Sequence, residues 1–342
     1  MKILDIRSDT GTFPTDAMRE AMRNAAVGDD VCKDDPTTNL LEETAAKMVG
    51  KERALFVPSG TFGNQLSLFT HCQRGEEVIL EDGCHIIQHE AGAASIIAGV
   101  QLRGITSENG VMPLTEIEGK IRKTIDIHFP KTGLICLENA LSSGKVLPVE
   151  YMRSVYDIAK KFDLKVHLDG ARLFNAAVAL NVDVKEITKY TDSVTFCLSK
   201  GLCAPIGSIV AGSKEFIEKA IFKRKIMGGG MRQTGVIAAP GIIAIKEMTK
   251  RLHIDHENAR YLAEEISKNN LIEVFSDRLD INMIFFKINK TTDSDSMISF
   301  FRKNNILIYP PENGVYRFVT NNGIEKEDIP YIAQVMNQFL SI

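Results

Sequence analysis

The sequence predicts an α/β protein with a large N-terminal domain and a smaller C-terminal one. Short apolar runs alternate with amphipathic helical stretches along most of the chain, which is the α/β pattern. The runs are apolar nearly throughout, as expected for a sheet covered by helices on both faces. After about residue 246 the pattern changes. We therefore predict an N-terminal arm and large domain over residues 1–245, and a small domain over residues 246–342.

The N-terminal half carries clear helix and strand signals. Thr15 can cap a helix whose residues Met18, Ala21, Met22 and Ala25 fall on one face. A second helix is predicted over 37–50, where Gly50 is a natural C-terminal stop. A further helix is predicted over 148–162. The expected strands are ALFV (54–57), EVIL (77–80), GLICLE (133–138), LKVHLD (164–169), SVTFCL (193–198) and GSIVAG (207–212).

The last hundred residues predict a compact α+β unit. A long helix with a polar face spans 251–270, and the strand INMIFFKI follows at 281–288. The remaining expected elements are a helix over 295–305, the segments ILIYP (306–310) and VYRFVT (315–320), and a final helix over 327–340. This length suffices for a small domain.

Composition narrows the class of protein. The chain has 342 residues and a formal net charge of −3, which gives no electrostatic argument for binding nucleic acid or an anionic membrane. No apolar run reaches membrane-spanning length, and the first ten residues lack the apolar core of a secretory signal. The six cysteines form no CxxC pair, which favours reduced thiols. We expect a cytoplasmic protein.

The segment PSGTFGNQ, residues 58–65, follows a predicted strand and opens a helix. Such a glycine-rich turn, here with Gly60, exposes backbone N–H groups at the positive end of a helix dipole, which suits a phosphate. Thr61 adds a hydroxyl and Asn64 an amide. The segment matches neither GxGxxG nor GxxxxGKS, so a dinucleotide or nucleoside triphosphate fold gains little support. A tight turn with Ser/Thr capping is the structural alternative.

Two charged residues stand at the ends of predicted buried strands. Asp169, in KVHLDGARLF, is either a structural cap, a metal ligand or the partner of a charged cofactor, because a buried carboxylate needs compensation. Lys200, in SVTFCLSKG, is either a solvated lysine or an amine that forms a Schiff base.

The segment HIIQHE places His85 and His89 four residues apart, a spacing that can bind zinc on a helix. No third ligand is evident and Glu90 is not placed as in HExxH, so we predict no metal. His85 could instead stack its ring on an aromatic group or carry a proton. Four basic residues could hold a carboxylate or phosphate, although each taken alone could be a surface charge: Arg172, Lys225, Arg232 and Arg317.

Taken together, the phosphate cradle, the strand-end Asp169 and the later Lys200 describe a site for pyridoxal 5′-phosphate. The lysine would form the Schiff base, and the aspartate would pair with the pyridinium nitrogen, which keeps the ring an electron sink.

The chain resembles the low-specificity L-threonine aldolases, enzymes of the aspartate-aminotransferase-like fold (fold type I), with a mostly parallel sheet. The resemblance covers nearly the whole chain and rests on these motifs: LDIRSDTGTFPT, VGDDVCKDDPTTN, FVPSGTFGNQ, LENALSSGKVLP, HLDGARLFNA, CLSKGL and GGGMRQTG. It implies pyridoxal phosphate as cofactor and a homodimer or homotetramer with active sites shared between subunits.

The resemblance also implies roles for individual residues. Lys200 carries the cofactor, Asp169 pairs with its ring nitrogen, and Gly60 and Thr61 lie at its phosphate. His85 stacks on the ring. The remaining matches are Arg172 at a cofactor or substrate anion, Ser8 and Arg317 at the substrate carboxylate, His128 near the substrate side chain, and Lys225 and Arg232 at the phosphate of the partner subunit's cofactor.

The implied activity is retro-aldol cleavage of L-threonine and L-allo-threonine to glycine and acetaldehyde, with Lys200, His85 and His128 as catalytic residues. The alternatives are a phenylserine-type aldolase, a β-eliminating lyase, or a cofactor-binding protein without turnover. The family reads GDDVYG where this chain reads GDDVCK, so Cys32 replaces a tyrosine and Lys33 a glycine. This departure bears on side-chain preference and turnover more than on cofactor binding.

Overall fold

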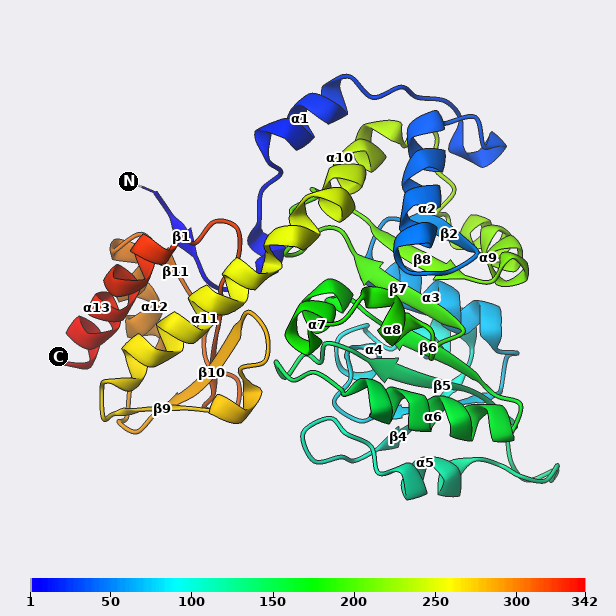
Figure 1. Cartoon of the computed structure of the whole chain (residues 1–342). Helices are drawn as coiled ribbons and strands as arrows, with labels where there is room; N and C mark the ends of the chain where they lie inside the picture. The colour runs from blue at the N-terminus through cyan, green and yellow to red at the C-terminus, as the bar shows by residue number, and fades with distance from the viewer. Residues whose placement is uncertain (1, 342) are drawn as a thin grey trace.

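The computed structural model describes residues 2–341, which form a large α/β unit beside a smaller C-terminal unit (Figure 1). A seven-stranded sheet with the order β2-β8-β7-β6-β5-β3-β4 forms the centre of the large unit. Its strands are β2 (Arg53–Val57), β3 (Glu77–Glu81), β4 (Gln101–Ile105), β5 (Thr132–Glu138), β6 (Lys165–Asp169), β7 (Ser193–Cys197) and β8 (Ser208–Gly212).

The sheet is mostly parallel. Strands β4, β3, β5, β6 and β7 run in one direction, whereas β8 is antiparallel to β7 and to β2. The predicted fold class is confirmed. Strand β4 was not predicted, because QLRGI is an edge strand with half-exposed side chains and lacks the continuous apolar run of the central strands.

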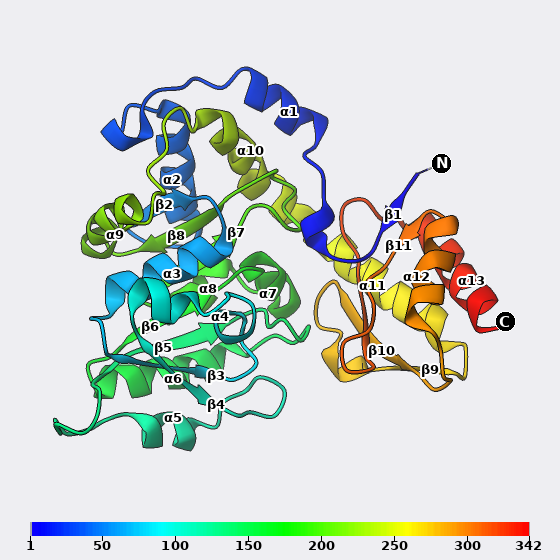
Figure 2. The ribbon, with the colours of Figure 1, turned by 180° about the vertical axis from the view of Figure 1, so that it is seen from behind.

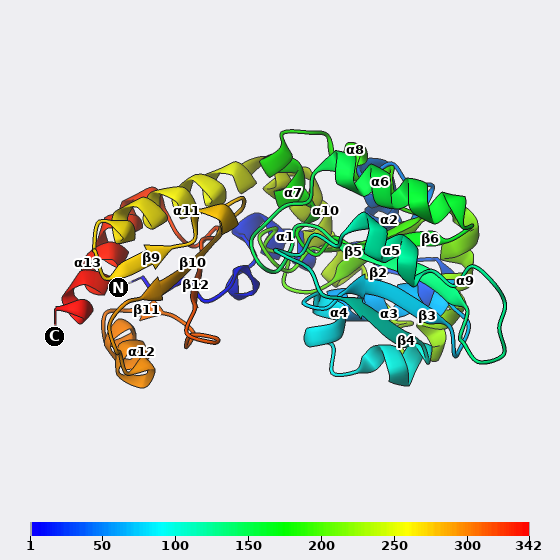
Figure 3. The ribbon, with the colours of Figure 1, turned by 90° about the horizontal axis from the view of Figure 1, so that it is seen from below.

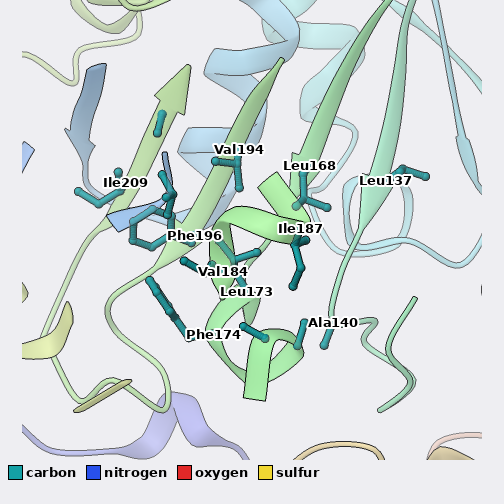
Figure 4. Packing of buried hydrophobic residues seen from close by; sticks show 14 of the residues in the cluster. Leu137, Ala140, Leu168, Leu173, Phe174, Val184, Ile187, Val194, Phe196 and Ile209 are labelled. Carbon is teal, nitrogen blue, oxygen red and sulfur yellow. The ribbon is translucent and has the colours of Figure 1, made fainter. Parts of the chain in front are cut away.

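Helices cover both faces of this sheet. Leu168, Val194 and Phe196 face a core formed with α7 and α8 (Figure 4). Neighbouring strand residues such as Leu55 and Val210 face the opposite core under α3 and α9. The helices of the large unit are α1 (Asp16–Arg23), α2 (Pro36–Met48), α3 (Gly60–His71), α4 (His85–Gln88), α5 (Leu114–Lys120), α6 (Val149–Lys161), α7 (Leu173–Leu180), α8 (Val184–Thr188), α9 (Lys214–Ile226) and α10 (Gly235–Lys246).

The C-terminal unit packs a small sheet against three helices (Figures 2 and 3). Its sheet has the order β12-β10-β9, and β1 pairs with β11 in a separate parallel pair. The elements are β9 (Ile272–Val274), β10 (Met283–Ile288), β11 (Ile306–Leu307), β12 (Tyr316–Val319), α11 (Leu252–Ser267), α12 (Ser294–Lys303), α13 (Ile329–Leu340) and, from the N-terminus, β1 (Leu4–Asp5). Leu4 and Ile6 therefore lie in the core of this unit, packed among residues of the C-terminal part of the chain. The division at residues 245 and 246 stays a prediction.

Local helix signals are borne out. The side chain of Thr15 accepts a hydrogen bond from the backbone N–H of Met18 at the start of α1. Gly50 follows α2 with a φ of 63°, the left-handed conformation that favours glycine after a helix. No helix within residues 2–341 is both long and apolar enough to span a membrane.

Candidate active site

Three parallel strands bring polar side chains to one edge of the sheet. Glu138 ends β5, Asp169 ends β6, and Lys200 follows β7 by three residues. Since the carboxyl ends of parallel strands meet at the same edge, residues 62 positions apart converge here. Ligands bind at this edge in open α/β sheets.

Asp169 is buried and its carboxylate is held from two sides. Its Oδ2 accepts a hydrogen bond from Asn64 Nδ2 at 2.7 Å, and its Oδ1 accepts one from the backbone N–H of Ala171 at 3.0 Å. Asn64 comes from α3, so the helix that starts at the PSGT turn also fixes the strand-end carboxylate. This pairing satisfies a buried charge whose cost would otherwise be large.

His85 is fixed by Glu90. The ring nitrogen Nδ1 lies 2.8 Å from Glu90 Oε1, and the buried Glu90 also accepts hydrogen bonds from the amides of Asn64 and Gln65. The hydrogen bond that the His85 ring donates to Glu90 raises the pKa of His85 despite the opposing effect of burial. Because a carboxylate only accepts, Nδ1 carries the proton and neutral His85 keeps the lone pair on Nε2.

His85, Glu90 and Asp169 each offer one ligand atom, and these atoms lie within 4.8 Å of one another. The amide of Asn64 stands between the two carboxylates, donating at 2.8 Å to Glu90 and at 2.7 Å to Asp169. Hydrogen-bond donors of the protein thus already occupy this cluster. His89, the partner in the zinc spacing, lies outside it, with its ring centroid 5.6 Å from that of His85.

The PSGT turn forms the N-terminus of α3, as a phosphate cradle requires. Ser59 caps the helix by accepting from the backbone N–H of Phe62, which leaves the N–H groups of Gly60 and Thr61 without intrahelical acceptors. A Cβ on Gly60 would lie 2.8 Å from Cys197 Sγ, so only glycine allows this close approach to the end of β7. The buried Ser208 Oγ lies 3.8 Å from the same position and has no hydrogen-bond partner in the described structure.

A cavity of about 760 Å³ opens between this sheet edge and the C-terminal unit. Five of the predicted site residues line it: Ser8, His85, Arg172, Lys200 and Arg317. Lys200 is anchored by its backbone, whose carbonyl accepts a hydrogen bond from Thr12 at 2.8 Å. Its amine has no hydrogen-bond or ion-pair partner among the described residues.

Arg172 is already paired within the chain. Its Nε and Nη2 donate to the two oxygens of Asp9 at 2.8 and 2.6 Å, and both side chains are almost fully buried. Burial opposes ionisation of Asp9, but the charge and hydrogen bonds of Arg172 outweigh it and lower the pKa of that carboxyl. One carboxylate therefore balances the charge of Arg172 before any ligand arrives.

Arg317, in contrast, meets no carboxylate. It lies on β12 opposite Phe285, and no hydrogen bond or ion pair joins its guanidinium to any residue of 2–341. Burial and the nearby charge of Arg172 lower its pKa. Because arginine stays protonated at any physiological pH, Arg317 is an unpaired cation that faces the cavity.

Three predicted residues lie away from this cavity. The exposed His128 pairs with Asp126 at 2.8 Å. Arg232 is exposed and donates to Asp29 at 2.6 Å, and Lys225 is exposed at the end of α9. Their predicted roles are not met within one chain and stay predictions.

The departure from the family motif lies outside the cavity lining. Cys32 is exposed at the end of a short 3-10 helix. Lys33 has a φ of 61°, a conformation that glycine adopts without strain. Its ammonium lies 3.0 Å from the buried Glu42, an ion pair that glycine could not make.

Sequence reasoning missed the carboxylates that hold the site together. Asp9 and Glu90 were visible in RSDT and HIIQHE, yet only the neighbouring Ser8 and His85 were assigned roles. Glu138 was the last letter of a predicted strand, and it accepts from the backbone N–H of His85 at 2.8 Å. A strand-end position like that of Asp169 was the signal that could have identified it.

The chain belongs to the beta-eliminating lyase family, which residues 5–289 match. Low-specificity L-threonine aldolase 1 of Arabidopsis thaliana is 47% identical over 345 residues, covering 99% of this chain and 96% of that protein. The low specificity L-threonine aldolase of Escherichia coli K12 is 42% identical over 340 residues, covering 99% and 100% of the two chains. The resemblance predicted from the motifs is confirmed.

Solved structures show the same fold. A threonine aldolase from Leishmania major superposes with a TM-score of 0.83 at 17% identity, covering 98% of this chain and 99% of that one. A PLP-dependent aminotransferase from Streptococcus suis superposes with a TM-score of 0.72 at 19% identity, covering 99% and 94%.

Proposed function

We propose that this protein cleaves L-threonine and L-allo-threonine to glycine and acetaldehyde, with pyridoxal 5′-phosphate as cofactor. The observation that carries the proposal is that Asp169 lies beside His85 at the edge of the sheet where Lys200 follows the neighbouring strand, in a chain of this family. The relatives named above are threonine aldolases.

The residues present fit this cofactor. The N-terminus of α3, with no room for a Cβ at Gly60 and an orphaned hydroxyl on Ser208, offers donors to a phosphate. Asp169 would accept a hydrogen bond from the ring nitrogen, and the partnerless amine of Lys200 would carry the carbonyl carbon. When bound, the cofactor supplies an electron sink for the bond that breaks at the amino-acid Cα.

The protein's own side chains then orient the substrate. Arg317 is an unpaired cation that can take the α-carboxylate, and Ser8 adds a hydroxyl to the same cavity. Fixing the carboxylate sets the rotation about the substrate's Cα and so selects which bond breaks.

His85 is the base that the geometry favours. Its Nε2 is free of hydrogen bonds in the described structure while Glu90 holds the proton on Nδ1, so it can take the β-hydroxyl proton. His128 is exposed beside Asp126 and does not line the cavity of its own chain, which makes it the less favoured base.

We further propose a homodimer or homotetramer. Phe13, Phe222 and Ile226 expose 71 to 79% of their surface, which is costly for a monomer in water. Lys225 stands next to Ile226, so a second chain seated there would meet it. Cytoplasmic location stays a prediction.

The test is a product assay on the purified protein loaded with cofactor. Equal amounts of glycine and acetaldehyde from L-threonine support the proposal. The second candidate, β-elimination, which the name of the matching family favours, would release 2-oxobutyrate and ammonia instead. Cleavage of phenylserine together with inertness toward threonine would support the phenylserine-type alternative.

A further inference from the structure

The cavity is lined by a third arginine, Arg278, that the proposed function does not use. It follows Asp277 at the end of a short 3-10 helix before β10, and it lines the cavity together with Ser143 and Phe285. Neither the motifs nor the predicted roles include it.

Arg278 is held in place without being neutralised. Its Nε donates to the backbone carbonyl of Ser143 at 3.1 Å, and its guanidinium lies 4.0 Å from the ring centroid of Phe285. No carboxylate lies within ion-pair distance among residues 2–341, and its two terminal nitrogens donate to no described residue. The adjacent Asp277 forms an ion pair with Lys145, whose Nζ lies 3.0 Å from Asp277 Oδ2.

A second unsatisfied donor stands beside it. Ser143 Oγ is buried and has no hydrogen-bond partner in the described structure, although the neighbouring Ser142 hydroxyl is bonded to Glu138 at 2.7 Å. A buried polar group without a partner costs free energy unless a ligand or water satisfies it. Arg278 and Ser143 meet where the two units face each other, and together they offer three unused groups to a ligand in the cavity.

The charges of the cavity leave room for one more anion. Asp9 neutralises Arg172, and the substrate α-carboxylate would neutralise Arg317. The cofactor phosphate would lie at the N-terminus of α3, outside the residues that line this cavity. The cation of Arg278 remains, and an exposed acid, Glu312, lines the cavity without pairing with it.

We propose that Arg278 and Ser143 form a subsite for a carboxylate on the β-carbon side of the substrate, so that the enzyme also cleaves 3-hydroxyaspartate. This inference rests on the proposed aldol cleavage. In the reaction the Cα–Cβ bond breaks and the hydroxyl proton goes to the base. Cβ becomes the aldehyde carbon of glyoxylate, and Cα keeps the electron pair and takes up a proton to give glycine. No oxidant or further reactant is needed.

The test compares kcat/KM for L-3-hydroxyaspartate, L-threonine and the uncharged L-3-hydroxyasparagine in the holoenzyme and in variants. Arg278→Met keeps an apolar stem over Phe285 and removes the charge. We expect it to lower kcat/KM for 3-hydroxyaspartate by roughly 10- to 100-fold, the value of a charged hydrogen bond, and the other two by less than about threefold. Arg278→Lys should restore part of the loss for the charged substrate only.

Each other outcome overturns the inference. Equal losses on all three substrates would make Arg278 a structural link between the two units. A wild-type enzyme that cleaves threonine and not 3-hydroxyaspartate would remove the carboxylate subsite and leave the proposed function standing. Cleavage of neither substrate would remove both.

Discussion

The two walls of the cavity treat charge in opposite ways. On the side of the large unit, the buried carboxylates of Glu90, Glu138 and Asp169 lie behind the residues that line the cavity, and each accepts two or more hydrogen bonds from the protein. On the wall of the C-terminal unit, neither Arg317 nor Arg278 pairs with a carboxylate in the part of the chain that the structure describes. Side chains that must keep one geometry are hydrogen-bonded to other side chains or to the backbone of the protein. Side chains that bind and release the substrate in each turnover have no such partner.

Lys200 is an exception to the pairing of polar groups on the side of the large unit. It lies on the side of the large unit, yet its amine has no partner among residues 2–341, as expected for an atom that takes part in the proposed chemistry. Lys200→Ala should lower turnover by on the order of 10³-fold or more, since the variant loses the lysine that lines the cavity in the described structure. The visible absorbance of the lysine-bound cofactor should vanish in the same variant. An unchanged spectrum would assign that role to another lysine.

The two histidines predicted to be catalytic, His85 and His128, differ in the same way in their surroundings. His85 belongs to the paired wall, and His128 is exposed beside Asp126. His85→Asn should lower kcat by about 10²-fold or more, the usual value of a general base, and His128→Asn should lower it by less. Steady-state kinetics of both variants on L-threonine measures this, and the reverse order would place the base on a neighbouring subunit.

Glu90 tunes the base. Its hydrogen bond raises the pKa of His85, and a base works only when deprotonated, so kcat/KM should rise with pH through that raised pKa. Glu90→Gln removes the charge, so the pKa of His85 falls and the acid limb of the pH profile moves to lower pH. The full pH–rate profile of both proteins measures the shift. If the acid limb of the profile did not move in Glu90→Gln, the group that titrates there would not be His85.

The fold could be predicted much further than the site. Apolar strands and capped helices can be predicted from residues close together in sequence. Asp169 and Lys200 come together because the carboxyl ends of parallel strands meet at one edge of the sheet. Asp9 could not be assigned in this way, since it gains its role from Arg172, 163 residues away in the sequence. Glu90 lies only five residues from His85, but no regular helix or strand period predicts that the two side chains meet. The exposure of His128 is likewise set by the path of a loop and not by its sequence pattern.

The central claim is that the large unit holds the cofactor and the C-terminal unit holds the substrate carboxylate. It can be tested by measuring the binding of both molecules in two variants, Arg317→Gln and Asp169→Asn. For each, the Kd of the cofactor and the KM for L-threonine are measured on the same preparation. Arg317→Gln should raise KM by roughly tenfold or more, the value of a charged hydrogen bond, and leave the cofactor Kd unchanged. Asp169→Asn should weaken cofactor binding and lower kcat, with a smaller effect on KM. If Arg317→Gln weakened cofactor binding as much as it raised KM, the C-terminal wall would be part of the cofactor site and the account would be contradicted.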